Sequence, residues 1–171
     1  MIHLYTGGVR AGKSRLALAE VQTLAPIGTI RFVATATPGD GEMSDRIRRH
    51  QDERGPRFQT LEEPIHPEQA LDDPDAAAFL IDCMTLWISN LLFHPGSSEV
   101  FIHSRVAALT ARLAREPRPV VVVTNEVGLG IIPGDALSRR YQDHLGRANQ
   151  AVAAVADRVD FVVAGLALRV R

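Results

Sequence analysis

A phosphate-binding motif near the start of this chain constrains its fold more than any other feature. The pattern G-x-x-x-x-G-K-S is matched in full by Gly7-Gly8-Val9-Arg10-Ala11-Gly12-Lys13-Ser14. The apolar run Ile2–Thr6 precedes the motif, and Ser14–Leu24 follows it with apolar residues at helical spacing. Glycines let backbone N–H groups converge on phosphate oxygens, and the following helix directs the positive end of its dipole at them. The motif therefore predicts a strand, a phosphate-binding loop and a helix in succession.

Several polar side chains are candidates to act on the bound phosphates. We expect Lys13 to reach the β- and γ-phosphates and Ser14 to ligate Mg²⁺. Asp82 ends the apolar stretch Phe79–Asp82 and is expected to support the metal. Because a helical pattern follows it, Asp82 is also a candidate helix N-cap, and the two roles are compatible. Glu126 follows a run of valines, where it is either a ligand-facing carboxylate or a capping residue.

Short apolar runs alternate with longer helical patterns along the chain. Strands are expected at Ile2–Thr6, Thr29–Thr35, Ala78–Asp82, Val120–Thr124 and Val159–Val163, and an added edge hairpin at Leu166–Val170. Helices are expected at Ser14–Leu24, Met43–Glu53, Thr85–Leu92, Val100–Arg115 and Leu137–Ala156. Loops are expected where Pro and Gly cluster, near 38–41, 55–56, 64–74, 95–96 and 133–134. This order predicts an α/β fold, one domain over residues 1–171, with a mostly parallel sheet covered by helices on both faces.

The composition excludes several other classes of protein. With 20 acidic and 19 basic residues the formal net charge is -1, which argues against a strongly basic nucleic-acid-binding surface. The 46% hydrophobic content argues against disorder, and the one cysteine excludes an intrachain disulfide or a multi-cysteine metal site. We find no signal-peptide pattern and no apolar run near the length of a membrane span, so we expect a cytoplasmic protein. Lys13 is the one lysine among the basic residues, at the position where a compact ammonium suits the phosphates better than a forked guanidinium.

A charged segment with a central histidine, Glu42–Arg54, has too few apolar residues for a core helix. If it is helical, Arg46, His50 and Arg54 lie four residues apart on one face. Guanidiniums stabilise charge on a phosphate, and nearby positive charge favours the neutral imidazole, which is the nucleophilic form. From these residues alone, a solvated charged helix is the simpler interpretation. The other histidines form no metal-ligand cluster in the sequence and are expected to be structural: His3, His66, His94, His103 and His144.

Further motifs accompany the phosphate-binding loop. They are Ala34-Thr35-Ala36, Glu42-Met43-x-x-Arg46-Ile47-x-x-His50, Asn90-Leu91-Leu92-Phe93, Val123-Thr124-Asn125-Glu126-Val127-Gly128-Leu129-Gly130-Ile131-Ile132-Pro133 and Gly146-Arg147-x-Asn149-Gln150. With them the chain resembles, over nearly its whole length, the bifunctional adenosylcobinamide kinase/adenosylcobinamide-phosphate guanylyltransferase family of cobalamin biosynthesis. The element around His50 and the element around Asn125 are more diagnostic of that family than the phosphate-binding loop.

The resemblance implies two reactions. ATP or GTP phosphorylates the aminopropanol hydroxyl of adenosylcobinamide, and GMP from GTP is then transferred to adenosylcobinamide phosphate to give adenosylcobinamide-GDP. The guanylylated histidine of the family corresponds to His50, whose ring nitrogen would attack the α-phosphate and expel pyrophosphate. The resulting phosphoramidate divides one difficult transfer into two easier ones.

The resemblance also implies nucleotide contacts and an assembly. Beyond the loop Gly7–Ser14, the contacts correspond to Ala34, Thr35, Ala36, Gln51, Asp52, Glu53, Arg54, Glu62 and Asp82. Glu63 beside Glu62 leaves an ambiguity of one residue, and a solvated loop carboxylate is the alternative. Ala11 replaces a serine of many relatives, and Arg49 stands where some relatives have a second histidine. The implied fold is a RecA-like P-loop domain, often assembled as a homotrimer, so we expect a homo-oligomer.

Two other functions fit part of the sequence. A small-molecule P-loop kinase without guanylyltransferase activity would use Lys13, Ser14 and Asp82 and leave His50 without a role. A nucleotide-dependent switch would hydrolyse its nucleotide slowly and change its affinity for a partner. The general base for a kinase step stays open between Asp82 and Glu126.

Overall fold

One sheet runs through the computed structural model, which describes residues 1–36 and 55–171. Within these residues seven strands follow the order β3-β2-β4-β5-β1-β6-β7. The strands are β1 (Ile2–Gly7), β2 (Thr29–Ala34), β3 (Phe58–Glu62), β4 (Ala76–Asp82), β5 (Val120–Val123), β6 (Arg158–Val163) and β7 (Leu166–Arg169). All neighbouring strands pair in parallel except β7, which pairs with β6 as an antiparallel hairpin. The mostly parallel sheet and the edge hairpin expected from the sequence are confirmed.

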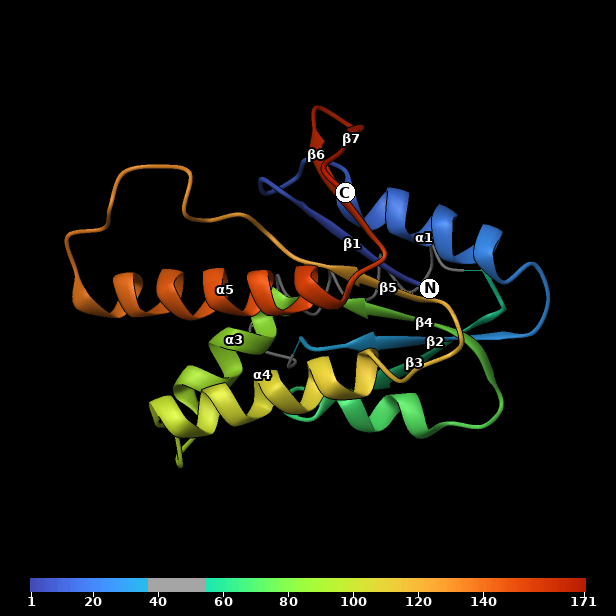
Figure 1. Cartoon of the computed structure of the whole chain (residues 1–171), viewed down its shortest axis with the longest axis horizontal. Helices are drawn as coiled ribbons and strands as arrows, with labels where there is room; N and C mark the ends of the chain where they lie inside the picture. The colour runs from blue at the N-terminus through green and yellow to red at the C-terminus, as the bar shows by residue number, and fades with distance from the viewer. Residues whose placement is uncertain (37–54) are drawn as a thin grey trace.

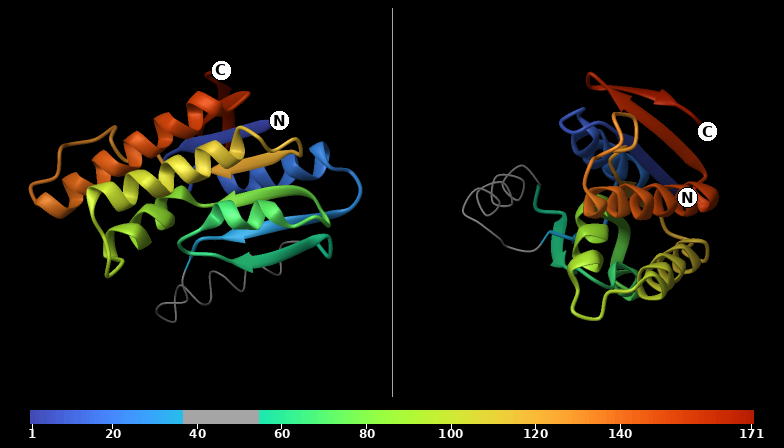
Figure 2. Two further views of the ribbon diagram at one scale, coloured as in Figure 1. Left: turned by 60° about the horizontal axis from the view of Figure 1, so that its bottom comes forward. Right: turned by 90° about the vertical axis from the view of Figure 1, so that its left-hand side faces the viewer.

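Helices cover both faces of the sheet (Figure 1). They are α1 (Lys13–Leu24), α3 (Met84–Phe93), α4 (Glu99–Leu113), α5 (Ala136–Val155) and the 3-10 helix η1 (Pro67–Asp72). Helix α1 packs on β1, β4 and β5, whereas α3 and α4 pack against α5 on the other side. Figure 2 shows β3 and the β6–β7 hairpin at opposite edges of the sheet.

Side chains of the central strands alternate between two hydrophobic cores. Val121 and Val123 contribute to the core beneath α1, and Val120 and Val122 contribute to the larger core beneath α3, α4 and α5. All four valines are at most 2% exposed. A strand covered on both faces reads as a continuous apolar run, which explains the four consecutive valines. Each such side chain contributes about 1.5–3 kcal/mol by leaving water.

Polar caps fix where two of the helices begin. Ser98 Oγ accepts a hydrogen bond from the N–H of Phe101 at the start of α4, and Asp135 Oδ1 accepts one from Ser138 at the start of α5. That hydrogen bond lowers the pKa of the Asp135 carboxyl. Helix α1, in contrast, begins after Gly12 with no side-chain cap. Its first backbone N–H groups therefore lack a side-chain acceptor, as a helix that receives a phosphate requires.

Two elements were missed in the sequence, and one expected helix is not described. Strand β3 is mostly exposed at the edge of the sheet, so it lacks the apolar alternation that would indicate it. Residues 64–74 were expected to be a loop, but they contain η1, which begins at Pro67. The expected helix Met43–Glu53 lies outside the described residues. No helix in the described ranges is long and apolar enough to cross a bilayer.

Candidate functional site

The predicted site residues that the structure describes gather at the carboxyl edge of the sheet. The strand register aligns five Cα positions across it: Glu62, Ala34, Asp82, Val123 and Tyr5. Strand β1 continues two residues beyond Tyr5 to Gly7, where the phosphate-binding loop begins. Because parallel strands end on the same side, residues from five separate strands meet at the edge where ligands bind in open α/β sheets.

At two glycines the backbone of the phosphate-binding loop packs directly against the backbone of another segment. Gly7 has φ +145°, and a Cβ there would lie 2.3 Å from the carbonyl oxygen of Val162 on β6. Gly12 has φ +100°, and a Cβ there would lie 3.3 Å from the Cα of Gly165. Gly165, in the turn of the β6–β7 hairpin, also donates its N–H to Ala11 O at 2.9 Å. The hairpin thus supports the phosphate-binding loop through Gly165, a role that no local sequence pattern indicates.

Lys13 lies folded against its own loop. Its Nζ donates to the carbonyl oxygens of Gly7 at 3.1 Å and Gly8 at 2.6 Å, and the residue is 7% exposed. Burial lowers the pKa of the Lys13 ammonium, and the negative charge of Asp82 opposes this shift. A phosphate in the loop would stabilise the charged form of Lys13 further, because it adds negative charge where the ammonium has lost water.

Thr35 fastens the end of β2 to the end of β4. Its Oγ1 donates to Cys83 O at 2.7 Å and accepts the N–H of Cys83 at 2.9 Å, while its own N–H donates to Asp82 O at 3.2 Å. Asn90 on α3 donates its Nδ2 to Thr35 O at 2.7 Å. Thr35 is fully buried. Its hydroxyl, N–H and carbonyl are thus all engaged within the protein, where they join the end of β2 to Asp82 and Cys83.

Removing the Thr35 hydroxyl should lower the thermal stability of the protein. In Thr35→Val the backbone N–H of Cys83 loses its partner, while the C=O of Cys83 keeps the N–H of Trp87 as a donor, and the change should cost about 1–3 kcal/mol. For a chain of this size that lowers Tm by about 2–12 °C in thermal unfolding followed by circular dichroism. Thr23→Val is the matched control, because Thr23 is exposed and bonds only within α1. Equal Tm values for the two variants would contradict this role of Thr35.

The single cysteine stands next to Asp82. Burial raises the pKa of the Cys83 thiol to about 11, and the charge of Asp82 adds to that rise. The group is therefore a neutral thiol near neutral pH, and it offers no nucleophile to a bound nucleotide.

Two of the sequence motifs meet behind the loop. Thr124 Oγ1 donates to Asn149 Oδ1 at 2.7 Å, and Asn149 Nδ2 donates to Asn125 O at 3.0 Å. Asn125 in turn donates its N–H and its Nδ2 to Thr85 Oγ1 at 3.1 and 2.9 Å. Thr124 and Asn149 are buried. The network ties α5 and α3 to the carboxyl end of β5, which neither motif revealed by itself.

The two glutamates singled out in the sequence occupy different positions. Glu126 donates its N–H to Gly7 O at 3.1 Å and lines an open cavity of about 240 Å³ with Thr6 and Gln150. Glu62 is exposed at the end of β3. Glu63 Oε1 accepts the N–H groups of Ile65 at 3.0 Å and His66 at 2.8 Å. The carboxylate of Glu63 thus serves the following turn, which favours Glu62 as the ligand-facing residue.

Part of the predicted site lies outside the described residues. This part comprises Arg46, His50, Gln51, Asp52, Glu53 and Arg54. They belong to the connection between β2, which ends at Ala34, and β3, which begins at Phe58.

Comparison with known proteins places the chain among related sequences. A family described as cobinamide kinase / cobinamide phosphate guanyltransferase matches residues 3–170. The bifunctional adenosylcobalamin biosynthesis protein CobP of Pseudomonas aeruginosa is 42% identical, over 97% of this chain and 95% of the relative. The bifunctional adenosylcobalamin biosynthesis proteins CobU of Salmonella typhimurium and Escherichia coli are 38% and 35% identical, over 100% of both chains in each case.

A solved structure extends the comparison to the fold. It is an ATPase domain that matches 94% of this chain and 68% of its own, with a TM-score of 0.52 and 10% sequence identity. At that identity the likeness concerns the fold alone. It confirms the α/β architecture with a mostly parallel sheet that was expected from the sequence.

Proposed function

Because the chain belongs to the cobinamide kinase / cobinamide phosphate guanyltransferase family, we propose that the carboxyl edge of its sheet binds the nucleoside triphosphates that both reactions consume. The protein is a bifunctional kinase and guanylyltransferase of adenosylcobalamin biosynthesis. The observation that carries the proposal is the uncapped start of α1 beside the buried ammonium of Lys13. Both features present positive charge at the place where phosphates would bind.

In the kinase step the loop stabilises charge on the transferred phosphoryl group. The aminopropanol hydroxyl of adenosylcobinamide attacks the γ-phosphorus of ATP or GTP, and the nucleoside diphosphate leaves. Lys13 exchanges its bonds to Gly7 and Gly8 for bonds to the β- and γ-phosphates, and the N–H groups of the loop donate to the remaining phosphate oxygens. The hydroxyl proton passes to a carboxylate, for which Asp82 and Glu126 are the candidates at this edge.

A magnesium ion fits the oxygen donors beside the loop. Mg²⁺ prefers carboxylate and hydroxyl oxygens, which Asp82 and Ser14 supply, and the charge of Asp82 already acts on Lys13. When bound, the ion would neutralise charge on the phosphate oxygens. Asp82 is held for this role by Thr35 and by its place at the end of β4.

The guanylyltransferase step requires a nucleophile, which we assign to His50. A nitrogen of its ring attacks the α-phosphorus of GTP and pyrophosphate leaves; a phosphate oxygen of adenosylcobinamide phosphate then displaces the histidine to form adenosylcobinamide-GDP. The resemblance of the surrounding motif supports this assignment. In the described part of the chain, each of the other five histidines contacts groups outside the phosphate-binding loop: His3 contacts Asp160, His66 Arg105, His94 Gly96, His103 Glu99 and His144 Glu99.

The remaining nucleotide contacts are proposed on the same basis. The backbone of Gly7–Gly12 and the side chain of Ser14 would surround the phosphates, whereas Ala34, Thr35, Ala36 and Glu62 lie at the neighbouring strand ends. Gln51–Arg54 would complete the set from the segment that carries His50.

Assembly and location also remain proposals. We infer a homo-oligomer, as a homotrimer, from the family resemblance. A single domain over residues 1–171 and a cytoplasmic location are inferred from the sequence pattern. Exposed apolar side chains between β5 and α5, at Leu129, Ile131 and Ile132, give such an assembly apolar surface to bury.

A kinase without guanylyltransferase activity is the alternative function. The full-length match to relatives that are named bifunctional weighs against it. The alternative predicts that wild-type protein makes adenosylcobinamide phosphate and no GDP derivative.

The Asp82→Asn variant tests the proposed metal support. We expect the kinase turnover number to fall by about 10²–10³-fold, because one charge-stabilising group is lost. The Mg²⁺ concentration needed for half-maximal rate should rise, since one anionic oxygen is missing. Both are measured as initial rates of adenosylcobinamide phosphate formation across a Mg²⁺ titration. Asp143→Asn, on the exposed face of α5, is the control, and a normal Mg²⁺ dependence in Asp82→Asn would overturn the assignment.

A further inference from the structure

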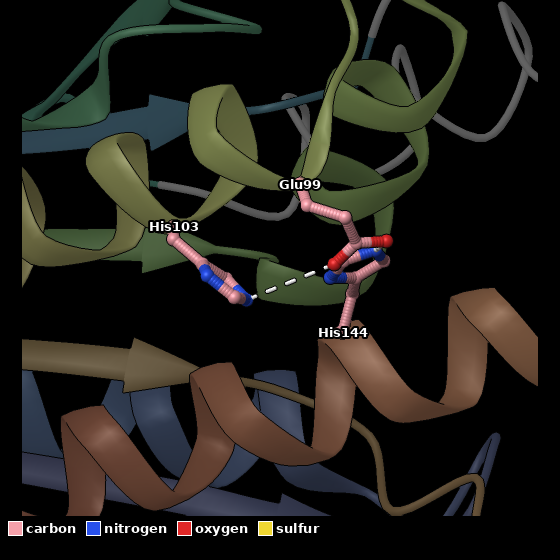
Figure 3. Close-up of side chains that lie close together, drawn as sticks. All are labelled: Glu99, His103 and His144. Carbon is pink, nitrogen blue, oxygen red and sulfur yellow. Dashed lines mark hydrogen bonds and ion pairs between the residues drawn. The ribbon is translucent and has the colours of Figure 1, made fainter.

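Two histidines and a glutamate, far apart in the sequence, meet between α4 and α5 (Figure 3). Glu99 and His103 lie one turn apart on α4, and His144 faces them from α5. One ligand atom from each side chain lies within 4.8 Å of the others. We propose that this cluster binds a divalent transition ion of the Zn²⁺ class, at a site separate from the nucleotide site and independent of the proposed function.

The distances are close to those that a bound ion requires. His144 Nε2 lies 3.2 Å from Glu99 Oε1, and His103 Nε2 lies 3.9 Å from Glu99 Oε2. Zinc binds imidazole nitrogen and carboxylate oxygen at about 2.0–2.2 Å in tetrahedral geometry, so neighbouring ligand atoms lie about 3.3–3.6 Å apart. The side chain of His103 is 52% exposed and that of Glu99 is 55% exposed, so both can adjust by the small amount needed.

His144 is the most rigidly held of the three candidate ligands. Its side chain is 2% exposed, and Glu99 is the hydrogen-bond partner of its Nε2. In the described part of the chain its buried Nδ1 has no hydrogen-bond partner. An open cavity of about 290 Å³ beside His103 and His144 leaves room for water as a fourth ligand. Two imidazoles, one carboxylate and an open position form a donor set that suits zinc better than magnesium.

Two arginines compete with the ion for the same groups. Arg147 Nη1 lies 3.5 Å from His103 Nε2, and Arg140 Nη2 lies 3.8 Å from Glu99 Oε1. Both arginines are exposed and can turn toward solvent when a cation binds. The bound ion would fasten α4 to α5, the helix whose Asn149 supports Thr124 and Asn125 behind the phosphate-binding loop.

Metal titration of the whole, untagged protein tests the site. After chelator treatment, with no nucleotide and no Mg²⁺ present, we expect one Co²⁺ per chain with the intense visible absorption of four-coordinate cobalt. Zn²⁺ should displace the Co²⁺ and raise Tm. Loss of a group that only hydrogen-bonds to a metal ligand typically lowers metal affinity by about 10–100-fold. His103→Ala and Glu99→Gln each remove a ligand itself, so we expect the affinity for Co²⁺ to fall by at least about 100-fold. Arg147→Gln should bind more tightly than wild type, because a competing cation is removed.

Two control variants separate this site from other histidines. His94→Ala removes a histidine that stacks on Phe101 and bonds Gly96, outside the cluster, and should bind as wild type does. His50→Asn should also bind as wild type. Circular dichroism confirms that each variant is folded. Wild-type protein without a stoichiometric site, a folded His103→Ala with wild-type affinity, or binding that disappears in His50→Asn would each overturn the proposal.

Discussion

Lys13→Ala is expected to lower the turnover number for adenosylcobinamide phosphorylation by at least about 10²–10³-fold. Lys13 is the first residue of α1 and is 7% exposed, and the negative charge of Asp82 acts on its ammonium. Alanine is compatible with helix α1. It removes the cation that stabilises negative charge on the transferred phosphoryl group. Because burial already disfavours the charged lysine, its removal should not lower Tm.

The measurement is the initial rate of adenosylcobinamide phosphate formation at saturating nucleotide. Lys13→Arg should be similarly slow, because a forked guanidinium does not fit the space of an ammonium between the Gly7 and Gly8 carbonyls. Arg115→Ala, which removes an exposed cation just beyond the end of α4, is the control and should retain the wild-type rate. An unchanged rate in folded Lys13→Ala would refute the role of the loop in the kinase step.

His50→Asn should abolish GMP transfer and leave phosphorylation intact. Asparagine resembles histidine in size and polarity but cannot form the phosphoramidate. Loss of a covalent nucleophile typically costs far more than loss of one hydrogen bond, so we expect a decrease of at least about 10⁴-fold. The two products, adenosylcobinamide phosphate and adenosylcobinamide-GDP, are separated by chromatography after incubation with GTP.

The separation of the two activities is the informative part of this result. His94→Asn is the matched control, since its ring contacts Phe101 and Gly96 and should leave both activities unchanged. Formation of adenosylcobinamide-GDP by His50→Asn at the wild-type rate would show that another group is the nucleophile. Loss of both activities together would instead indicate that residue 50 holds the nucleotide for each reaction.

The sequence predicts those parts of the fold whose pattern follows from burial. The four valines of β5 are apolar because both faces of the strand are covered. The spacing of Tyr141 and Leu145 reflects the inner face of α5, whereas Leu137, one turn before Tyr141, is 48% exposed. Strand β3 could not be predicted in this way, since an exposed edge strand places few apolar side chains in a core. Local pattern thus predicts central elements better than edge elements.

For the site, the sequence identified reactive groups better than the groups that hold them. Lys13, Ser14 and Asp82 were predicted because phosphate and metal chemistry demand those side chains. Gly165 and Asn149 support the site through contacts about 150 and 25 residues away along the chain, which no local spacing encodes. The same reason explains why His103 and His144 did not appear as a cluster: their proximity depends on how α4 packs against α5.

We expect one chain to use its phosphate-binding loop for phosphorylation and a covalent histidine for guanylyl transfer. The most direct measurement is incubation of wild-type protein with Mg²⁺ and GTP labelled at the α-phosphate, followed by denaturing electrophoresis and peptide mapping. We predict a protein-bound GMP that is labile in acid and stable in base, on the peptide that contains His50. A folded wild-type protein that binds GTP and never retains the label, or that carries it on another peptide, would rule out His50 as the covalent nucleophile.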